Sequence, residues 1–398
     1  MGLRKLSWSL GIVLAVLLAG AALPSGPAHA QFTGDPEPEP GPEPGPEPSP
    51  EPSPSPSPSP SPTPSPAPSP TPSSEAEARA AESGTEASAT ANTRITNRRL
   101  IALVNRRTSS MLLTGQPAVP FVRREDLASG PLTGLSGGEG TESWALGRLG
   151  LWADGAGTVS GGFRRPDKFW AGQYSVMVGA DVRVPDDILA GASLGYEHVD
   201  VDFNTNRDRT VHYTFATVYG AALLTDTLSV DGLASYGVGA NTTREPAGSV
   251  LGTGEYDYLS HRVIAATSLS YNTMVGERVT VFGNGGITYS HEAFEGYDTA
   301  SGIAVETSDA FLGQLHLEGE LGYVFEYGAE SRLQPFLTTR LEYDYITSIG
   351  GERFGALVGG GLRAQISPAF SVEASGRTEV ARTESTSTSF ALTSRFQF

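Results

Sequence analysis

Apolar and polar residues alternate with a period of two through the C-terminal two thirds of the chain. In the segment 311–327, one face carries Phe311, Leu315, Leu317, Leu321, Tyr323, Phe325 and Tyr327, and the other carries Gln314, His316, Glu318, Glu320 and Glu326. Successive side chains of a strand point to opposite faces, so this pattern predicts β-strands with one apolar and one polar side. Clusters of Gly, Asp, Asn, Pro and Ser separate the segments, as turns do.

Twelve such segments can be counted, at 143–154, 170–183, 188–203, 208–223, 226–243, 256–273, 278–292, 308–327, 332–347, 354–366, 369–382 and 387–398. A soluble β-sandwich also alternates, but its strands usually run about five or six residues. A strand that crosses a bilayer at a tilt needs about 9 to 11 residues. The sequence therefore predicts an all-β fold, a twelve-stranded antiparallel transmembrane β-barrel over residues 143–398.

The polar face of each segment is expected to line the lumen and the apolar face to contact lipid. In 333–345 the predicted inward residues are Arg340, Glu342 and Asp344. In 211–223 the apolar set expected to contact lipid is Val211, Tyr213, Phe215, Tyr219 and Leu223. Aromatic residues at segment ends are expected to form interfacial girdles, and they include Trp144, Trp152, Trp170, Tyr196, Tyr271, Tyr289 and Tyr345.

A helical pattern precedes the barrel, at 95–113. Apolar Ile95, Leu100, Leu103 and Val104 recur beside arginines, of which Arg98, Arg99, Arg106 and Arg107 are candidates for lumenal charges. At 1.5 Å per residue the helix would be about 28 Å long, close to the roughly 25 Å apolar band of an outer-membrane barrel. A helix over 92–115 could therefore pass through the lumen.

The arginines of this helix have complementary partners on the predicted barrel wall. Glu318, Glu320 and Glu342 face inward in the predicted pattern, and Arg340 adds a counter-charge to the wall. Charges in a confined polar space need partners, which favours a helix held inside the barrel. A solvated pore without a plug is the alternative that the sequence leaves open.

The N-terminal part of the chain is divided by composition. Basic Arg4 and Lys5, an apolar run and small residues at Ala28 and Ala30 indicate a cleavable signal peptide over 1–30. Every second residue from Pro36 to Pro72 is proline, which fixes φ and removes amide donors. We therefore expect a disordered, polyproline-like stalk over 31–91 and a connecting loop over 116–142.

Composition excludes several classes of function. The net charge is −17, which argues against nucleic-acid binding because that needs a basic surface. The chain has no cysteine, so disulfides and thiolate metal sites are excluded. No apolar run after the signal is long enough for a transmembrane helix. No nucleophile, metal or phosphate motif is recognisable around the histidines, so we expect no catalysis, cofactor or metal.

The last segment ends with apolar residues at alternate positions, Phe390, Leu392, Phe396 and the terminal Phe398. This ending resembles the assembly signal of outer-membrane barrels. Together with the basic helix and the length of the barrel, it makes the region from about Asn92 to Phe398 similar in layout to the β-domain of autotransporters, the type V secretion family. The resemblance implies a helix in the pore, and outer-membrane lipid and the barrel-assembly and secretion machinery as partners.

The same resemblance shapes the functional expectation. We expect an outer-membrane translocator that displays a short Pro-rich segment in place of a large passenger, with the cell wall or a surface ligand as possible contacts of that segment. Members of the family cleave at asparagine in the pore helix, and Asn92, Asn97 and Asn105 are candidates by type, but we predict no cleavage here. The alternative is a porin-like channel whose Pro-rich segment contacts the cell wall in the periplasm.

Overall fold

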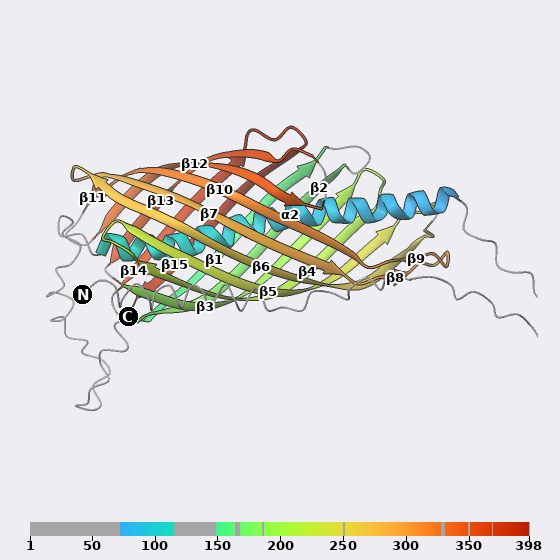
Figure 1. Cartoon of the computed structure of the whole chain (residues 1–398), viewed down its shortest axis with the longest axis horizontal. Helices are drawn as coiled ribbons and strands as arrows, with labels where there is room; N and C mark the ends of the chain where they lie inside the picture. The colour runs from blue at the N-terminus through green and yellow to red at the C-terminus, as the bar shows by residue number, and fades with distance from the viewer. Residues whose placement is uncertain are drawn as a thin grey trace, which may run out of the picture.

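The chain forms a closed antiparallel β-barrel with one helix inside it (Figure 1). The computed structural model describes residues 72–114, 149–163, 168–184, 187–249, 251–327, 331–348, 351–367 and 369–397. Side chains of the helix are described from Ser83 to Arg106. The predicted signal residues Ala28 and Ala30, and the terminal Phe398, lie outside the described residues.

Twelve long strands build the wall, and the fold class predicted from the alternation is confirmed. They are β1 (Leu149–Gly162), β2 (Phe169–Arg183), β3 (Ile188–Phe203), β4 (Asp208–Leu223), β5 (Leu228–Glu245), β6 (Gly254–Val275), β7 (Val279–Phe294), β10 (Ser308–Tyr323), β12 (Arg332–Thr347), β13 (Phe354–Ser367), β14 (Phe370–Glu379) and β15 (Ser385–Gln397). Each pairs with its sequence neighbour, and β1 pairs with β15 to close the cylinder. Closure leaves no strand edge unpaired, which is what a sheet in lipid requires.

Three short strands lie outside this cylinder of long ones. β8 (Tyr297–Asp298) and β9 (Ala304–Val305) form a hairpin between β7 and β10. β11 (Phe325–Glu326) extends the sheet beside the start of β12. The predicted inward position of Glu326 is wrong, because the strand is interrupted at Val324 and the Glu326 side chain is 57% exposed.

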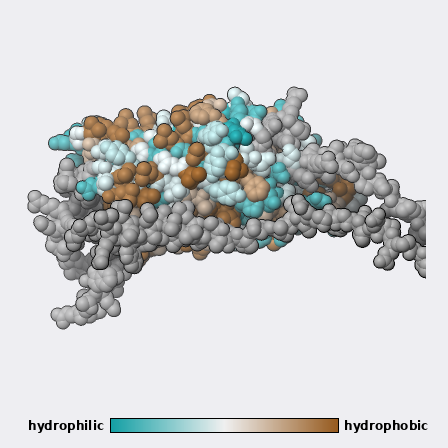
Figure 2. All heavy atoms as spheres, in the orientation of Figure 1, coloured by the Kyte–Doolittle hydropathy of each residue, from teal (hydrophilic) through white to brown (hydrophobic). Residues whose placement is uncertain are grey.

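The outer wall is largely apolar, as the alternation predicts. Leu315, Leu317 and Leu321 of β10 are exposed, whereas Gln314, His316 and Glu318 between them are buried in the lumen. Figure 2 shows apolar side chains over much of the visible wall. These side chains would be costly to expose in water and are suited to contact with acyl chains.

Strand β4 is a correction to the predicted facing. Its apolar residues Val211, Tyr213, Phe215 and Tyr219 are buried on the lumenal side, and His212 lies on the outside. Trp152, predicted in a girdle, also points inward, where its Nε1 donates to the Tyr219 hydroxyl at 2.8 Å. Alternation separates the two faces of a strand but does not say which of them points into the lumen. In β4 the apolar face points inward because the helix supplies an apolar surface for it to contact.

The helix α2 (Pro72–Thr114) is longer than the range 92–115 predicted from the sequence. It begins at Pro72, within the range expected to be stalk. Proline is favoured in the first turn of a helix because its missing amide would have no partner there. The alanine- and glutamate-rich stretch that follows has good helix formers. The first strand also begins later than predicted, at Leu149.

The two ends of the barrel differ. β1 begins and β15 ends at one end, where β2 connects to β3 and β6 to β7 through short turns. The longest connection between strands, from Phe294 to Ser308, lies at the other end and carries the β8–β9 hairpin. Outer-membrane barrels have short periplasmic turns and longer extracellular loops, so the end with the hairpin is named here the loop end.

Candidate functional site

The lumen is the candidate functional site, because α2 lies in it and carries charges that the wall pairs. Arg98 reaches two carboxylates: its Nε and Nη2 donate to Glu342 at 2.8 and 2.5 Å, and Nη2 also donates to Glu379 at 2.9 Å. Arg94 Nη2 donates to Asp344 at 2.6 Å. A two-pronged arginine–carboxylate contact fixes orientation as well as charge, so these pairs set the rotation of the helix.

The wall contributes its own arginines to the same cluster. Arg382 donates to Asp344 at 2.7 Å, and Arg340 donates to Glu342 at 2.8 Å and to Glu318 at 3.2 Å. The four carboxylates and three further arginines around Arg98 are all buried. Buried charges are stabilised only when each has partners, and here the partners come from α2, β10, β12 and β14 and from Arg382 in the connection between β14 and β15. The cluster therefore links the helix to the second half of the wall.

The opposite side of α2 is apolar and packs on the first half of the wall. Leu100, Ile101, Leu103 and Val104 form one cluster with side chains of β1 to β6. Those wall residues are Trp152, Met177, Leu189, Phe215, Tyr219, Ala221, Leu233, Ile264 and Ala266. The helix is thus held by apolar packing on one side and by ion pairs on the other.

Near the loop end, small polar residues of α2 meet charged side chains of the wall. Thr96 Oγ1 donates to Glu197 at 2.7 Å, and Arg262 bridges Glu197 and Glu292 at 3.1 and 2.9 Å. Arg207, in the connection between β3 and β4, donates to Thr85 at 2.8 Å. The N-terminal part of α2 therefore lies at the loop end.

Asn105 and Arg106 of α2 lie deeper, against strand positions nearer the end with the short turns. The side-chain oxygen Oδ1 of Asn105 accepts hydrogen bonds from the Ser268 hydroxyl and the Asn284 side-chain amide at 3.2 and 3.3 Å. Arg106 pairs with Glu373 at 3.0 Å and donates to Thr393 at 2.8 Å. Arg99 donates to Asp154 of β1 at 2.7 Å.

The structure brings together most of the residues singled out from the sequence. Arg98, Arg340, Glu318 and Glu342 belong to one ionic cluster. Glu320 instead pairs with Arg363 of the wall, at 2.5 and 2.8 Å, and not with an arginine of the helix. Arg107 lies in α2, but its side chain is outside the described part. Phe390, Leu392 and Phe396 are exposed on the outer face of β15.

Sequence reasoning missed several of the helix's partners. Asp154 and Arg382 were not recognised, although each follows the inward alternation of a predicted segment or its end. Glu197 and Arg262 were missed because the segments around them do not alternate clearly in charge. The apolar half of the lumen was missed altogether, since its residues look like a lipid-facing set.

His198 and His212, two of the histidines without a recognisable motif, lie on the outer wall of the barrel. His198 Nε2 contacts Asp200 at 2.8 Å, and its Nδ1 lies 3.2 Å from His212 Nδ1, all on the outer faces of β3 and β4. Within the described ranges no group of histidines and carboxylates could hold a metal ion. Among the described helices none is long and apolar enough to span a membrane.

Comparisons with known proteins agree with this architecture. The family model of the autotransporter β-domain matches residues 149–388. The chain belongs to the autotransporter β-domain family. The solved β-domain of a Bordetella autotransporter, BrkA, is similar at 16% identity and a TM-score of 0.55, over 63% of this chain and 100% of that one.

A second similar structure is the translocator domain of the autotransporter NalP from Neisseria meningitidis. It shares 14% identity at a TM-score of 0.50, over 63% of this chain and 88% of that one. No curated protein matches the sequence. The autotransporter β-domain described here is thus an outer-membrane translocator barrel, with membrane lipid around its wall.

Proposed function

We propose that this autotransporter barrel displays its own N-terminal segment, residues 31–71, at the cell surface and retains α2 as a permanent plug. The single observation that carries the proposal is the direction of α2. Thr85 contacts Arg207 at the loop end, and Arg106 contacts Glu373 deeper in the wall. Since loop ends of outer-membrane barrels face the exterior, the chain that precedes α2 is expected outside.

Retention of the helix follows from the number and burial of its contacts. Removing α2 would take the cations of Arg94 and Arg98 away from Asp344, Glu342 and Glu379, which are buried between the wall and the helix, and this is unfavourable. The same removal would expose the apolar wall that contacts Leu100 and Val104. A retained helix argues against the porin-like channel and also against release by cleavage at Asn92, Asn97 or Asn105.

We propose further that the displayed segment has a structural or adhesive role and no catalytic one. Residues 36–72 have proline at every second position and hence few amide donors and no apolar core. Such a segment suits a stiff spacer that contacts the cell surface or a surface ligand. Contact with the cell wall would instead require this segment to lie in the periplasm.

An epitope tag inserted after Pro60 tests the placement on intact cells. Tags after Ser301, in the β8–β9 hairpin, and after Asp226, between β4 and β5, mark the two ends of the barrel in the same assay. We expect antibody and added protease to reach the tag at Pro60 and the tag at Ser301, but not the tag at Asp226. If the tag at Pro60 behaves like the one at Asp226, the segment is periplasmic and display is excluded.

A further inference from the structure

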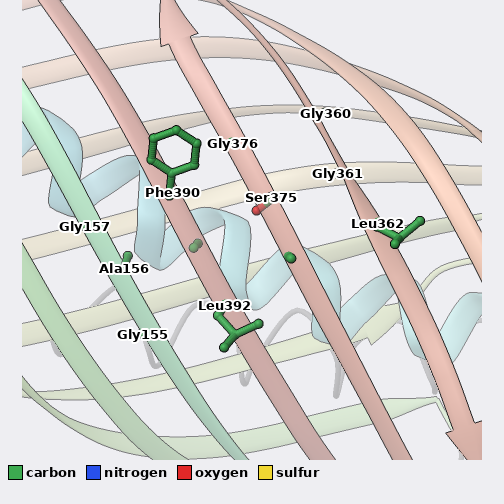
Figure 3. A pocket seen from close by; sticks show the side chains of 12 residues that line it. Gly155, Ala156, Gly157, Gly360, Gly361, Leu362, Ser375, Gly376, Phe390 and Leu392 are labelled. Atoms are coloured by element: carbon green, nitrogen blue, oxygen red, sulfur yellow. The ribbon is translucent and has the colours of Figure 1, made fainter.

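The outer wall has a shallow hollow of about 530 Å³ where β13, β14, β15 and β1 run side by side (Figure 3). Its floor consists of backbone and small side chains, and its raised parts are three large apolar side chains. The floor includes Gly155, Gly157, Gly360, Ala374 and Gly376, and the raised residues are Phe390, Leu392 and Leu362.

The register of the strands places the large side chains next to glycine and alanine, and this forms the hollow. Phe390 of β15 pairs with Gly157 on one side and Gly376 on the other. Leu392, two residues on, pairs with Gly155 and Ala374. The two large side chains therefore form a ridge between almost bare backbones, with Phe390 68% and Leu392 57% exposed.

The hollow offers no polar group to a ligand. The backbone amides and carbonyls of the four strands are engaged in the ladders between them. Ser375 has the only polar side chain among the lining residues, and it faces the lumen, where its Oγ lies 3.5 Å from Arg106 Nη2. An occupant must therefore be apolar.

The hollow lies at the middle of the strands. Ala374 and Gly376 are central in β14, and Gly155 and Gly157 are central in β1. It is continuous with the lipid-facing wall of an outer-membrane barrel, at the depth of the hydrocarbon core. A convex wall of another barrel would meet the ridge of Phe390 and Leu392 first, whereas a flexible chain can bend along the floor beside it.

We propose that the hollow holds one acyl chain of a membrane lipid in a fixed position. The proposal uses the outer-membrane location and does not depend on which segment the barrel displays. The free energy that favours an acyl chain in the hollow over one in bulk lipid is not hydrophobic, because bulk lipid is equally apolar. It comes from dispersion contacts with the floor and with the flanks of the ridge, which a smooth wall could not provide in the same number.

The test replaces glycines on the floor of the hollow with leucine, so that protein side chains occupy the space of the acyl chain. A Cβ added at Gly155 or Gly157 meets no atom within 4 Å, so both backbones have room for a side chain. Gly155→Leu/Gly157→Leu therefore places two side chains in the hollow, beside Phe390 and Leu392. Gly172→Leu is the matched control, since Gly172 on β2 is also exposed, also has nothing within 4 Å, and lies outside the hollow. Each protein is reconstituted in palmitoyl-oleoyl-phosphatidylethanolamine vesicles, extracted in detergent and examined by native mass spectrometry.

We expect the natural protein and Gly172→Leu to retain a single phospholipid per barrel, and the double variant to retain roughly tenfold less. Equal retention by all three proteins, or none by the natural protein, would overturn the proposal. A dimer mass that the double variant loses would also overturn it, because the occupant would then be a second copy.

A second variant keeps the test decisive if the double variant does not assemble. Leu362→Ala removes a raised side chain and adds no bulk, and it should lower retention as well. Heat-modifiable migration of every variant shows that its barrel is assembled before retention is compared. Loss of surface display with unchanged lipid retention would contradict the proposed function and leave the lipid site standing.

Discussion

At the scale of single residues, burial decides which arginines contribute to the stability of the fold. Arg98 and Arg244 each contact two carboxylates, Arg98 with Glu342 and Glu379, and Arg244 with Asp208 and Glu255. Their surroundings differ, because the Arg98 side chain is 9% exposed and that of Arg244 is 62% exposed. An exposed pair is screened by water and ions, whereas a buried carboxylate that loses its cation is left uncompensated.

Arg98→Ala should therefore lower the free energy of unfolding by about 2 to 3 kcal/mol, somewhat less than a fully unpaired buried charge costs because Arg340 and Arg382 remain near Glu342. Arg244→Ala should change it far less, because the exposed pair is screened by water and ions. Urea unfolding of both variants in the same detergent, followed by tryptophan fluorescence, measures the difference. Equal effects would mean that the lumenal pair is not a determinant of stability.

At the scale of elements, α2 is a helix with two functions on its two sides. Its apolar side packs on β1 to β6, and its arginines pair with carboxylates of β12 and β14 and with Asp154 of β1. Neither half of the wall alone would fix the rotation of the helix about its axis. Apolar packing tolerates small rotations, and the ion pairs form only when that packing holds the arginines at the right distance from the carboxylates. The connections at the loop end add a further link between elements.

Two of those connections are joined by Glu352, which lies between β12 and β13. The backbone amides of Thr383 and Glu384, between β14 and β15, donate to its carboxylate, as does the Thr383 hydroxyl. The Thr383 hydroxyl, together with these amides, lowers the pKa of Glu352. A carboxylate whose pKa is lowered on folding stabilises the fold above its unfolded value, about 4.3, and loses that effect as the pH falls through the lower folded pKa.

Hydrogen exchange at residues 380–384 should therefore be slow near neutral pH and should rise, after correction for the intrinsic rate, when the pH falls below about 4. Glu352→Gln should show fast exchange at both pH values, because an amide cannot accept all three hydrogen bonds. If exchange in the natural protein does not depend on pH, the carboxylate does not join the two connections.

At the scale of the whole molecule, the barrel and the helix form one sealed unit. The wall needs no partner strand, since β1 and β15 close it. The lumen is filled by α2, by the ionic cluster and by inward aromatic side chains. A translocator that keeps its helix is thus expected to be closed to ions after export is complete.

Deletion of residues 31–114, which joins the signal peptide directly to the chain before β1 and removes α2, should convert the barrel into an open pore. In planar bilayers we expect the full chain to show almost no conductance and the deletion variant to show stable ion-conducting openings. Arg98→Ala serves as the control, because the helix remains in place and the lumen stays filled. Equal conductance of the full chain and the deletion variant would contradict the plug.

The sequence by itself determined the strands, their number and the charged half of the lumen, because the period of two survives in almost every segment. It also indicated, through charge and alternation, the arginine-rich helix and its carboxylate partner Glu342. Only the tertiary structure decided which face of β4 points inward, since Val211 and Phe215 contact a helix that is distant in sequence. Only it revealed that α2 starts at Pro72 and enters from the loop end, because direction and depth depend on contacts such as Thr85 with Arg207 that no local pattern encodes.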